Sequence, residues 1–508
     1  MFPHQQPIPE QQPTNNTYEQ NPTTMLSLEK AVKRKSKIAA FRMWLAKNGL
    51  DEKDHQISGM KFCVEHEITD TPSNGVRGAI IADEMGLGKT ILMMGLNAVN
   101  PDKRTLIVLP PALMEQWINI IRNFAGVEPF VYHGVKAKAL PVEEIATKQL
   151  VVTTYGMIAQ RKKGTSKLWK VKWDRLICDE AHHLRNKKTG QFLGAKQLKA
   201  DIKWLVTGTP IQNSHGDFVS LCNILGLKLK QISKMNPELS SEEVAIRIIK
   251  THVLRRTKKK VGIQLPPMKE EVIKVEWESK EEKLLSAEIH ANTHFSNVSV
   301  DNVLRVIDHL SQHPLPMMMR AKQTCILPAL LEEAILKMKM AGNIPNHINL
   351  TRIPTSSKTN AVVSKIVERA DNGRKKLVFS HFRKEIDQLE NDLSRAGLRV
   401  GKVDGRSSKN YRKEAITSPI YDVLIVQIQT ACEGLNMQHF QEVYFTSPHW
   451  NPAVEDQAIA RCHRIGQTEE VEVFRFAMKG FDDDSMTIDE YCMLIQEKKR
   501  ELQSMLDQ

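Results

Sequence analysis

The sequence predicts an α/β fold made of two doubly wound parallel-sheet lobes, and three observations support this prediction. Short apolar runs alternate with helix-length segments over residues 76–210, and the same alternation returns over residues 376–474. Runs that are apolar throughout are typical of parallel strands that helices cover on both faces. With 508 residues, the chain is long enough for two or three domains.

The sequence predicts five strands in each lobe. In the first lobe we expect strands at residues 78–82, 105–109, 150–155, 175–178 and 204–207. In the second lobe we expect them at residues 376–380, 399–403, 423–427, 442–445 and 470–474, with helices over 383–396 and 454–462. Since helix-length segments separate the strands, the connections suit parallel sheets.

The other segments complete the predicted domain organisation. The chain begins with a stretch rich in Pro, Gln, Asn and Thr, and we expect residues 1–27 to be disordered. We expect the first lobe over residues 28–240, a helical insertion and linker over 241–350, the second lobe over 351–480 and a C-terminal helix over 481–508.

Charge and cysteine content narrow the class of protein. The net charge is +13, and a basic surface favours a polyanionic partner. The basic stretch at residues 30–37 is either a nuclear localisation signal or the solvated face of a helix that runs to residue 50. No apolar run reaches the roughly 18 residues of a membrane span, so we expect no membrane partner. The seven cysteines form no CxxC pair, which indicates a reducing compartment.

A candidate phosphate-binding loop follows the first predicted strand. It reads Asp83-Glu84-Met85-Gly86-Leu87-Gly88-Lys89-Thr90 and opens a predicted helix over residues 91–98. The glycines let backbone N–H groups face a phosphate, Lys89 would reach the β- and γ-phosphates, and Thr90 would hold Mg²⁺. Asp83 stands where the general pattern GxxxxGKT has glycine. The loop predicts ATP and Mg²⁺ as ligands.

An acidic pair, Asp179-Glu180, follows the apolar run that ends at Cys178. Carboxylates at the C-terminal end of a buried parallel strand lie where ligands bind in open α/β sheets. We expect Asp179 to hold the Mg²⁺ and Glu180 to orient or deprotonate the attacking water. A solvated surface loop is the alternative, and the position of the pair after a strand downstream of Lys89 argues against it.

Two further patterns point to the same chemistry. In residues 207–213 (TGTPIQN) small hydroxyl side chains end a strand, where Thr207 and Thr209 would sense the γ-phosphate; a simple Gly-Pro turn is the alternative.

Arg461 and Arg464 lie three residues apart and would share one face of a helix, from which they would act as catalytic arginine fingers. A solvated basic helix face is the alternative, which the phosphate loop in the other lobe disfavours.

Together these patterns resemble the Swi/Snf-type branch of helicase superfamily two, over about residues 50–500. The resemblance rests on residues 83–90, 179–182 (DEAH), 207–213, 450–452 (WNP) and 463–467 (HRIGQ). Aspartate at position 83 is normal in that branch. The branch usually has a glycine-rich run before Gly-Leu-Asn, and here that segment reads Thr430-Ala431-Cys432-Glu433-Gly434-Leu435-Asn436, a departure that bears on coupling to the tracked strand.

The resemblance implies that both lobes are RecA-like, and it implies further site residues. Gln56, within residues 55–59, would read the adenine base. Coupling or contact with DNA would fall to Thr154, Thr207, Thr209, Gln212, Asn436, Trp450 and Gln457. For Trp450 an ordinary place in the core is an equal alternative.

The function that the resemblance implies is ATP-dependent translocation along double-stranded DNA, with remodelling of protein–DNA complexes in transcription regulation. Nucleosomes or transcription proteins would be further partners, and the nucleus the compartment. Two alternatives stay open: a strand-separating DNA or RNA helicase, and a catalytically silent DNA-binding transcription scaffold. A bare motor of this size is also similar to the global transactivator proteins of large insect DNA viruses, which would place it in the host nucleus.

Overall fold

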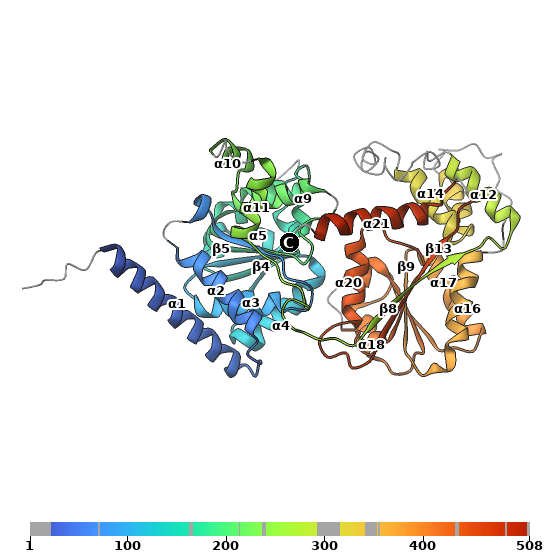
Figure 1. Ribbon diagram of the computed structural model, residues 1–508, viewed down its shortest axis with the longest axis horizontal. Helices are drawn as coiled ribbons and strands as arrows, with labels where there is room; N and C mark the ends of the chain where they lie inside the picture. The colour runs from blue at the N-terminus through green and yellow to red at the C-terminus, as the bar shows by residue number, and fades with distance from the viewer. Residues whose placement is uncertain are drawn as a thin grey trace, which may run out of the picture.

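The structure is a computed structural model of the chain. It describes residues 22–69, 72–161, 166–212, 214–235, 240–291, 315–340, 353, 356–431, 436–482 and 485–504. In this part of the chain, two parallel sheets flanked by helices form two lobes (Figure 1). The predicted α/β fold class is confirmed.

The first lobe is built on a seven-stranded sheet in the order β3-β4-β2-β5-β6-β1-β7, whose neighbours pair in parallel. The strands are β1 (Arg77–Ile81), β2 (Thr105–Leu109), β3 (Phe130–Tyr132), β4 (Leu150–Thr154), β5 (Lys172–Asp179), β6 (Lys199–Val206) and β7 (Val253–Leu254). The helices are α1 (Pro22–Lys47), α2 (Asp54–Ile68), α3 (Lys89–Val99), α4 (Met114–Ala125), α5 (Gly134–Ala139), α6 (Val142–Ala146), α7 (Tyr155–Ile158), α8 (Gly190–Gln197), α9 (His215–Leu225), α10 (Leu229–Met235) and α11 (Ser241–His252).

The second lobe is built on a six-stranded parallel sheet in the order β10-β11-β9-β12-β13-β8. The strands are β8 (Met268–Val275), β9 (Lys376–Ser380), β10 (Val400–Val403), β11 (Val423–Gln427), β12 (Glu442–Phe445) and β13 (Val471–Met478). The helices are α12 (Lys280–Ala291), α14 (Leu315–Ile326), α15 (Ala329–Met340), α16 (Ser357–Glu368), α17 (Arg383–Arg395), α18 (Lys409–Thr417), α19 (Ile428–Ala431), α20 (Pro452–Cys462) and α21 (Ile488–Ser504).

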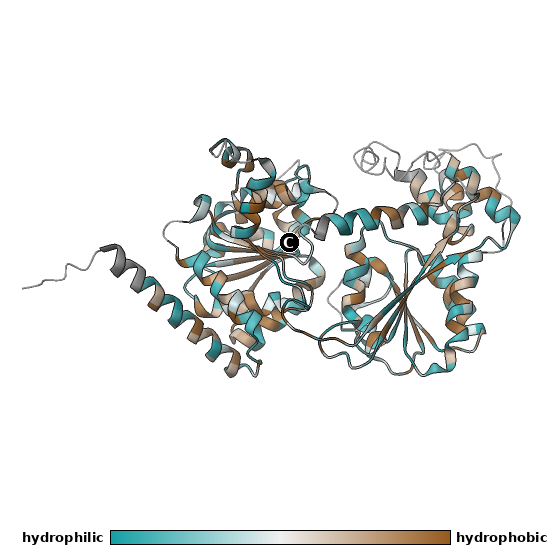
Figure 2. Cartoon of the chain, viewed as in Figure 1, coloured by the Kyte–Doolittle hydropathy of each residue, from teal (hydrophilic) through white to brown (hydrophobic). Residues whose placement is uncertain are grey.

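Each sheet separates two apolar cores. Along β1, Ile80 packs into one cluster of buried apolar residues and Ala79 into another. Along β9, Val378 packs on one face while Leu377 and Phe379 pack on the other. Successive strand side chains point to opposite faces, so a strand between two helical layers is apolar at most of its positions. Figure 2 shows this apolar character along the strands of the first sheet.

The segment 241–350 was predicted as a helical insertion and linker, and this prediction is wrong for residues 268–275. These residues form β8, the edge strand of the second sheet, which pairs with β13. Most of its side chains are exposed. Its sequence, MKEEVIKV, therefore lacks the continuous apolar run by which the other strands were recognised.

Two predicted boundaries also differ. The first sheet includes β7, which pairs with β1 at Ile80 and Ile81, so the first lobe extends beyond the predicted end at residue 240. Helix α1 begins at Pro22 within the segment 1–27 that was predicted to be disordered, and residues 1–21 lie outside the described residues. The basic stretch 30–37 lies within this helix, where Ile38 and Phe41 are buried. This supports the helical interpretation of the stretch.

Helix α21 runs from the second lobe toward the first (Figure 1). It packs against α14, α20 and β13 of the second lobe. Its position agrees with the predicted C-terminal helix. Among the described residues, no helix combines the length and apolar character that a membrane crossing requires.

Candidate active site between the two lobes

The predicted phosphate loop connects β1 to α3 at the C-terminal edge of the first sheet. Gly86 and Gly88 have positive φ angles of 91° and 79°, a conformation that side-chain-bearing residues rarely adopt. A Cβ at Gly88 would lie 2.5 Å from Nε2 of Gln56. The amide of Gln56 therefore lies directly against the loop.

Lys89 begins α3, and its ammonium group is held inside the loop. Its Nζ donates to the backbone carbonyls of Asp83, at 2.8 Å, and Glu84, at 3.3 Å. Burial lowers the pKa of Lys89, while the negative charges of Glu180, Asp83 and Asp179 oppose this shift. A phosphate entering the loop would meet a cation that neutral carbonyl groups hold in place.

The carboxylate of Asp83 has a dedicated partner, which explains the aspartate in place of the usual glycine. Nε of Arg256 donates to Oδ1 of Asp83 at 3.0 Å, and Nη2 donates to Oδ2. Two residues further on, the backbone N–H of Lys258 donates to Oε2 of Glu84 at 2.7 Å, and its Nζ lies 3.1 Å from Oε1. The stretch after β7 therefore pairs with both acidic residues of the phosphate loop.

Sequence reasoning did not assign Arg256 and Lys258 to the site. The sequence offers one signal for this contact: two acidic residues at 83 and 84 have two basic counterparts at 256 and 258. Only the parallel pairing of β1 with β7 brings the two segments together.

Asp179 and Glu180 follow β5, as predicted. Nε1 of Trp117 donates to Oδ2 of Asp179 at 2.7 Å, and the backbone N–H of Glu180 donates to Oδ1 at 3.0 Å. Burial and the adjacent charge of Glu180 raise the pKa of Asp179. Glu180 has a φ of 49°, a strained backbone conformation of the kind that concentrates at functional sites.

The carboxylate of Glu180 stays ionised. Burial would raise its pKa, but His182, Lys89 and Arg461 together lower it. Nδ1 of His182 lies 3.2 Å from Oε2 of Glu180 and 3.3 Å from Oγ1 of Thr207. His182 was part of the quoted DEAH pattern but was not predicted to bridge the acidic pair and the Thr207 segment.

The segment that follows β6 closes over the phosphate loop. The backbone N–H of Thr207 donates to the carbonyl of Ile81 at 3.0 Å, and a Cβ at Gly208 would lie 3.5 Å from Nζ of Lys89. Thr209 is buried, and its Oγ1 accepts from Nε2 of Gln212 at 3.0 Å. The structure therefore brings this segment together with the phosphate loop.

The second lobe contributes Arg461 to the same site. Arg461 lies in the last turn of α20, and its charge lowers the pKa of Glu180. Arg464 was predicted to share a helix face with it, and this prediction is wrong. Helix α20 ends at Cys462 because His463 has the non-helical angles φ −90° and ψ 81°.

The contacts described so far do not include four other predicted residues, Thr154, Trp450, Gln457 and Asn436. Thr154 ends β4, where its Oγ1 lies 3.4 Å from Nδ1 of His133. Trp450 packs against the core of the second lobe, with its ring centroid 6.4 Å from that of Tyr491, which agrees with the core alternative. Gln457 is buried in α20.

Asn436 donates through Nδ2 to Oε1 of Gln438 at 3.1 Å. Residues 432–435 of the altered segment 430–436 lie outside the described residues.

Thr90 and Asp179 fit the predicted Mg²⁺ role. Mg²⁺ usually takes one or two protein oxygens and completes its shell with water and substrate phosphates. One hydroxyl, from Thr90 at the start of α3, and one carboxylate, oriented by Trp117, match this need. Among the described residues there is no cluster of three or more His, Cys, Asp or Glu that would suit a metal cage.

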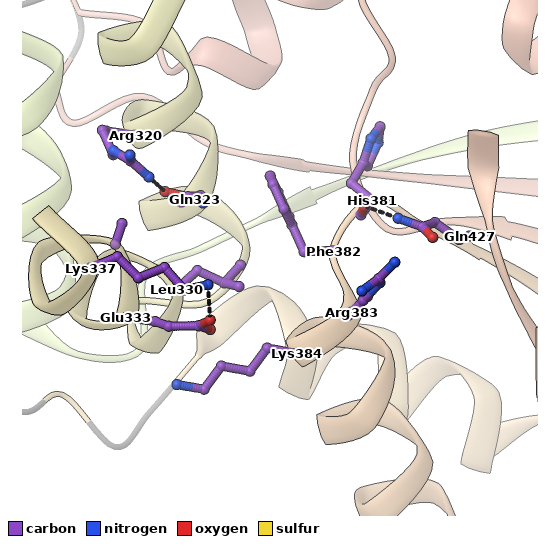
Figure 3. A pocket seen from close by; sticks show the side chains of 11 residues that line it. Arg320, Gln323, Leu330, Glu333, Lys337, His381, Phe382, Arg383, Lys384 and Gln427 are labelled. Atoms are coloured by element: carbon purple, nitrogen blue, oxygen red, sulfur yellow. Dashed lines mark hydrogen bonds and ion pairs between the residues drawn. The ribbon is translucent and has the colours of Figure 1, made fainter. Parts of the chain in front are cut away.

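A cavity of about 580 Å³ lies at the C-terminal edge of the second sheet (Figure 3). Residues from α14, α15, the start of α17 and the ends of β9 and β11 line it: Arg320, Gln323, Leu330, Glu333, Ala334, Lys337, His381, Phe382, Arg383, Lys384 and Gln427. Four of these carry a positive charge and one a negative charge. Arg383 and Lys384 lie in the first turn of α17, where the helix dipole disfavours cations and favours anions.

Known protein families match both lobes of this chain in sequence. The family model of the SNF2-related domain matches residues 55–330, and that of the helicase conserved C-terminal domain matches residues 357–466. Protein CHROMATIN REMODELING 5 of Arabidopsis thaliana is 28% identical over 460 residues, covering 84% of this chain and 25% of the relative. This chain thus spans about a quarter of the length of that relative.

A viral protein and a solved structure are also similar. The probable global transactivator of Orgyia pseudotsugata multicapsid polyhedrosis virus is 26% identical over 477 residues, covering 88% of this chain and 89% of the relative. The structure of the Sulfolobus solfataricus SWI2/SNF2 ATPase core in complex with dsDNA is 23% identical in sequence. It covers 89% of this chain and 92% of its own, with a TM-score of 0.38.

Proposed function

Since this chain belongs to the SNF2-related family of helicase superfamily two, we propose that it hydrolyses ATP to move along duplex DNA and remodel protein–DNA complexes. One observation carries the proposal: Arg461 of the second lobe acts electrostatically on Glu180 beside the phosphate loop of the first lobe. A nucleotide site that needs both lobes can couple hydrolysis to their relative motion.

Each residue of the site has a role in this mechanism. The phosphate loop and Lys89 bind the phosphates of ATP, and Gln56 contacts the base. Thr90 and Asp179 would hold Mg²⁺, which neutralises phosphate charge when bound. Glu180 would orient or deprotonate the attacking water through its carboxylate, which His182, Lys89 and Arg461 favour in the ionised form.

The second lobe completes the site. Arg461 carries a permanent charge at the end of α20 and would stabilise the negative charge that develops on the transferred phosphoryl group. Arg464, just beyond this helix, stays a predicted second arginine finger. The segment 207–209 contacts the phosphate loop and would report the state of the γ-phosphate to Gln212.

The cavity of Figure 3 supports nucleic acid as the substrate that is tracked. A phosphate backbone would offset the cost of placing Arg383 and Lys384 at the start of a helix. The net charge of +13 favours the same partner. The names of the relatives, a chromatin remodelling protein and a global transactivator, support a role in transcription with nucleosomes or transcription proteins as partners, in the nucleus or in the host nucleus.

Steady-state ATP hydrolysis tests the proposal, measured alone and with duplex DNA, single-stranded DNA or RNA. We expect duplex DNA to stimulate hydrolysis, and Glu180→Gln to lower the stimulated rate by about 100-fold or more, since a positioned carboxylate contributes that much to such reactions.

Each other outcome has a defined meaning. Stimulation by single strands or RNA only would favour the strand-separating helicase. The absence of hydrolysis under every condition would contradict the motor and leave the DNA-binding scaffold.

A further inference from the structure

The amide oxygen of Gln212 is shared by the two lobes. Oε1 of Gln212 accepts a hydrogen bond from Nη1 of Arg185 in the first lobe, at 2.9 Å, and from Nδ2 of Asn451 in the second, at 3.1 Å. Gln212 is held firmly on its own side, because its Nε2 donates to Oγ1 of Thr209 and its backbone N–H donates to Oδ2 of Asp217, both at 3.0 Å. Asn451 therefore meets a fixed acceptor.

Asn451 is also the N-cap of α20. Its Oδ1 accepts from the backbone N–H of Ala453 at 3.2 Å, while its Nδ2 points to Gln212. One side chain thus fastens the start of α20 to the first lobe. Arg461 lies on the same short helix, so the position of Asn451 limits where its guanidinium can reach.

Helix α21 supports this connection from the second lobe. Nζ of Lys499 donates to the carbonyl of Trp450, directly before Asn451, at 2.8 Å. Nε2 of Gln496 donates to the carbonyl of His449 at 2.6 Å. The charges of Asp217 and Arg185 both act on Lys499, which places this end of α21 beside the first lobe. The loop before α20 is thus held from both sides.

We propose that Asn451 is a positioning residue that fixes α20 against Gln212, so that Arg461 is aligned with Glu180 when the lobes close. The proposal rests on the proposed ATP hydrolysis and deepens it. Asn451 acts through Arg461 and does not touch the reacting atoms. Lys499 holds the backbone from which Asn451 acts.

Asn451→Ser tests the proposal, because serine caps a helix as well as asparagine does but its short side chain cannot reach Gln212. We expect kcat for DNA-stimulated ATP hydrolysis to fall about tenfold, the effect of one lost, partly buried hydrogen bond, with KM for ATP within about twofold. An unchanged kcat, or a KM that rises as much as kcat falls, would overturn the proposal.

Lys413→Ala is the matched control. Nζ of Lys413 lies 2.5 Å from Oε1 of Glu115, and this pair also joins the two lobes. Both of its side chains are more than half exposed, so the contact is worth little. We expect kcat to change less than twofold. A loss equal to that of Asn451→Ser would mean that any contact between the lobes suffices, and would contradict a specific role for Asn451.

A double-mutant cycle with Gln212→Leu separates the shared bond from other effects. If the bond between Asn451 and Gln212 is responsible, the double variant loses no more kcat than Gln212→Leu alone. Multiplicative losses would contradict the proposal.

Small-angle X-ray scattering of the wild type and Asn451→Ser gives a readout that is independent of hydrolysis. We expect a broader distribution of interlobe distances in the variant. If the wild type hydrolyses no ATP, the proposed function fails. An unchanged distribution of interlobe distances in Asn451→Ser would overturn the proposed role of Asn451 alone.

Discussion

Asp83 stands where a general phosphate-binding loop has glycine, and its carboxylate pairs with Arg256 from the stretch after β7. The side chain of Asp83 is 1% exposed and that of Arg256 is 14% exposed. A charge buried this far is costly unless it is paired. The buried carboxylate at this position therefore needs a basic partner. Arg256 provides it from 173 residues further along the chain.

Removing one partner of this pair should be worse than removing both. We expect Arg256→Ala to lower the apparent Tm by about 5 °C or more, because it leaves the carboxylate of Asp83 buried and unpaired. The double variant Asp83→Gly/Arg256→Ala restores the general loop pattern and should recover part of this loss. Differential scanning calorimetry of the three proteins measures both effects. A double variant less stable than Arg256→Ala would show that the loss comes from other contacts of Arg256.

At the scale of elements, α17 begins at the cavity and ends on the surface. Arg383 is its first residue and lines the cavity, while Arg395 is its last and has a side chain that is 79% exposed. The helix is 13 residues long, so the two arginines lie about 18 Å apart. They form a matched pair for testing whether the cavity binds nucleic acid.

Arg383→Ala should weaken binding of duplex DNA, and Arg395→Ala should not. We expect the dissociation constant to rise about threefold to tenfold for Arg383→Ala, with a shallower dependence on salt because one phosphate contact is lost. Fluorescence anisotropy over a range of salt concentrations measures both quantities. Equal effects of the two substitutions would indicate that only net charge matters and that the cavity is not a contact site.

At the scale of the whole molecule, one source of acid sensitivity lies where α21 joins the second lobe. His290 accepts a hydrogen bond from the backbone N–H of Ile488 on Nε2, at 3.0 Å, and its Nδ1 lies 2.7 Å from the carbonyl of Ser286. Nδ1 donates to this carbonyl in either charge state, but only the neutral ring can accept on Nε2. Burial lowers the pKa of His290 to about 4, and that of His449, beside α20, also to about 4.

The sign of the pH dependence follows from these shifts. An unfolded histidine takes up a proton near pH 6.5, whereas His290 in the folded chain stays neutral until about pH 4. Protons therefore favour the unfolded state, and stability is present above pH 6.5 and lost as the pH falls toward 4. We expect the apparent Tm to drop between pH 7 and pH 5, with a smaller drop for His290→Gln. Parallel curves for the two proteins would exclude His290 as a source of the effect.

Much of this protein follows from local sequence. Eight of the ten predicted strands differ from the structure by no more than three residues at either end, and all ten are present, because central parallel strands are apolar at most positions. The phosphate loop and the acidic pair were also located correctly at strand ends, since a strand, a turn and a helix are close in sequence. Whether these residues bind ATP and Mg²⁺ stays a prediction that the hydrolysis experiment tests.

Tertiary structure decided what local sequence does not encode. β8 carries the charged sequence of an edge strand, so only its pairing with β13 identifies it. The partnerships of Asp83 with Arg256 and of Gln212 with Asn451 join segments more than 170 residues apart, and no spacing rule links them. The sequence alone determined the central strands and the phosphate loop because their signals are local. The folded chain decided the partners of the buried charges and the meeting of the lobes, because those contacts depend on which surfaces packing brings together.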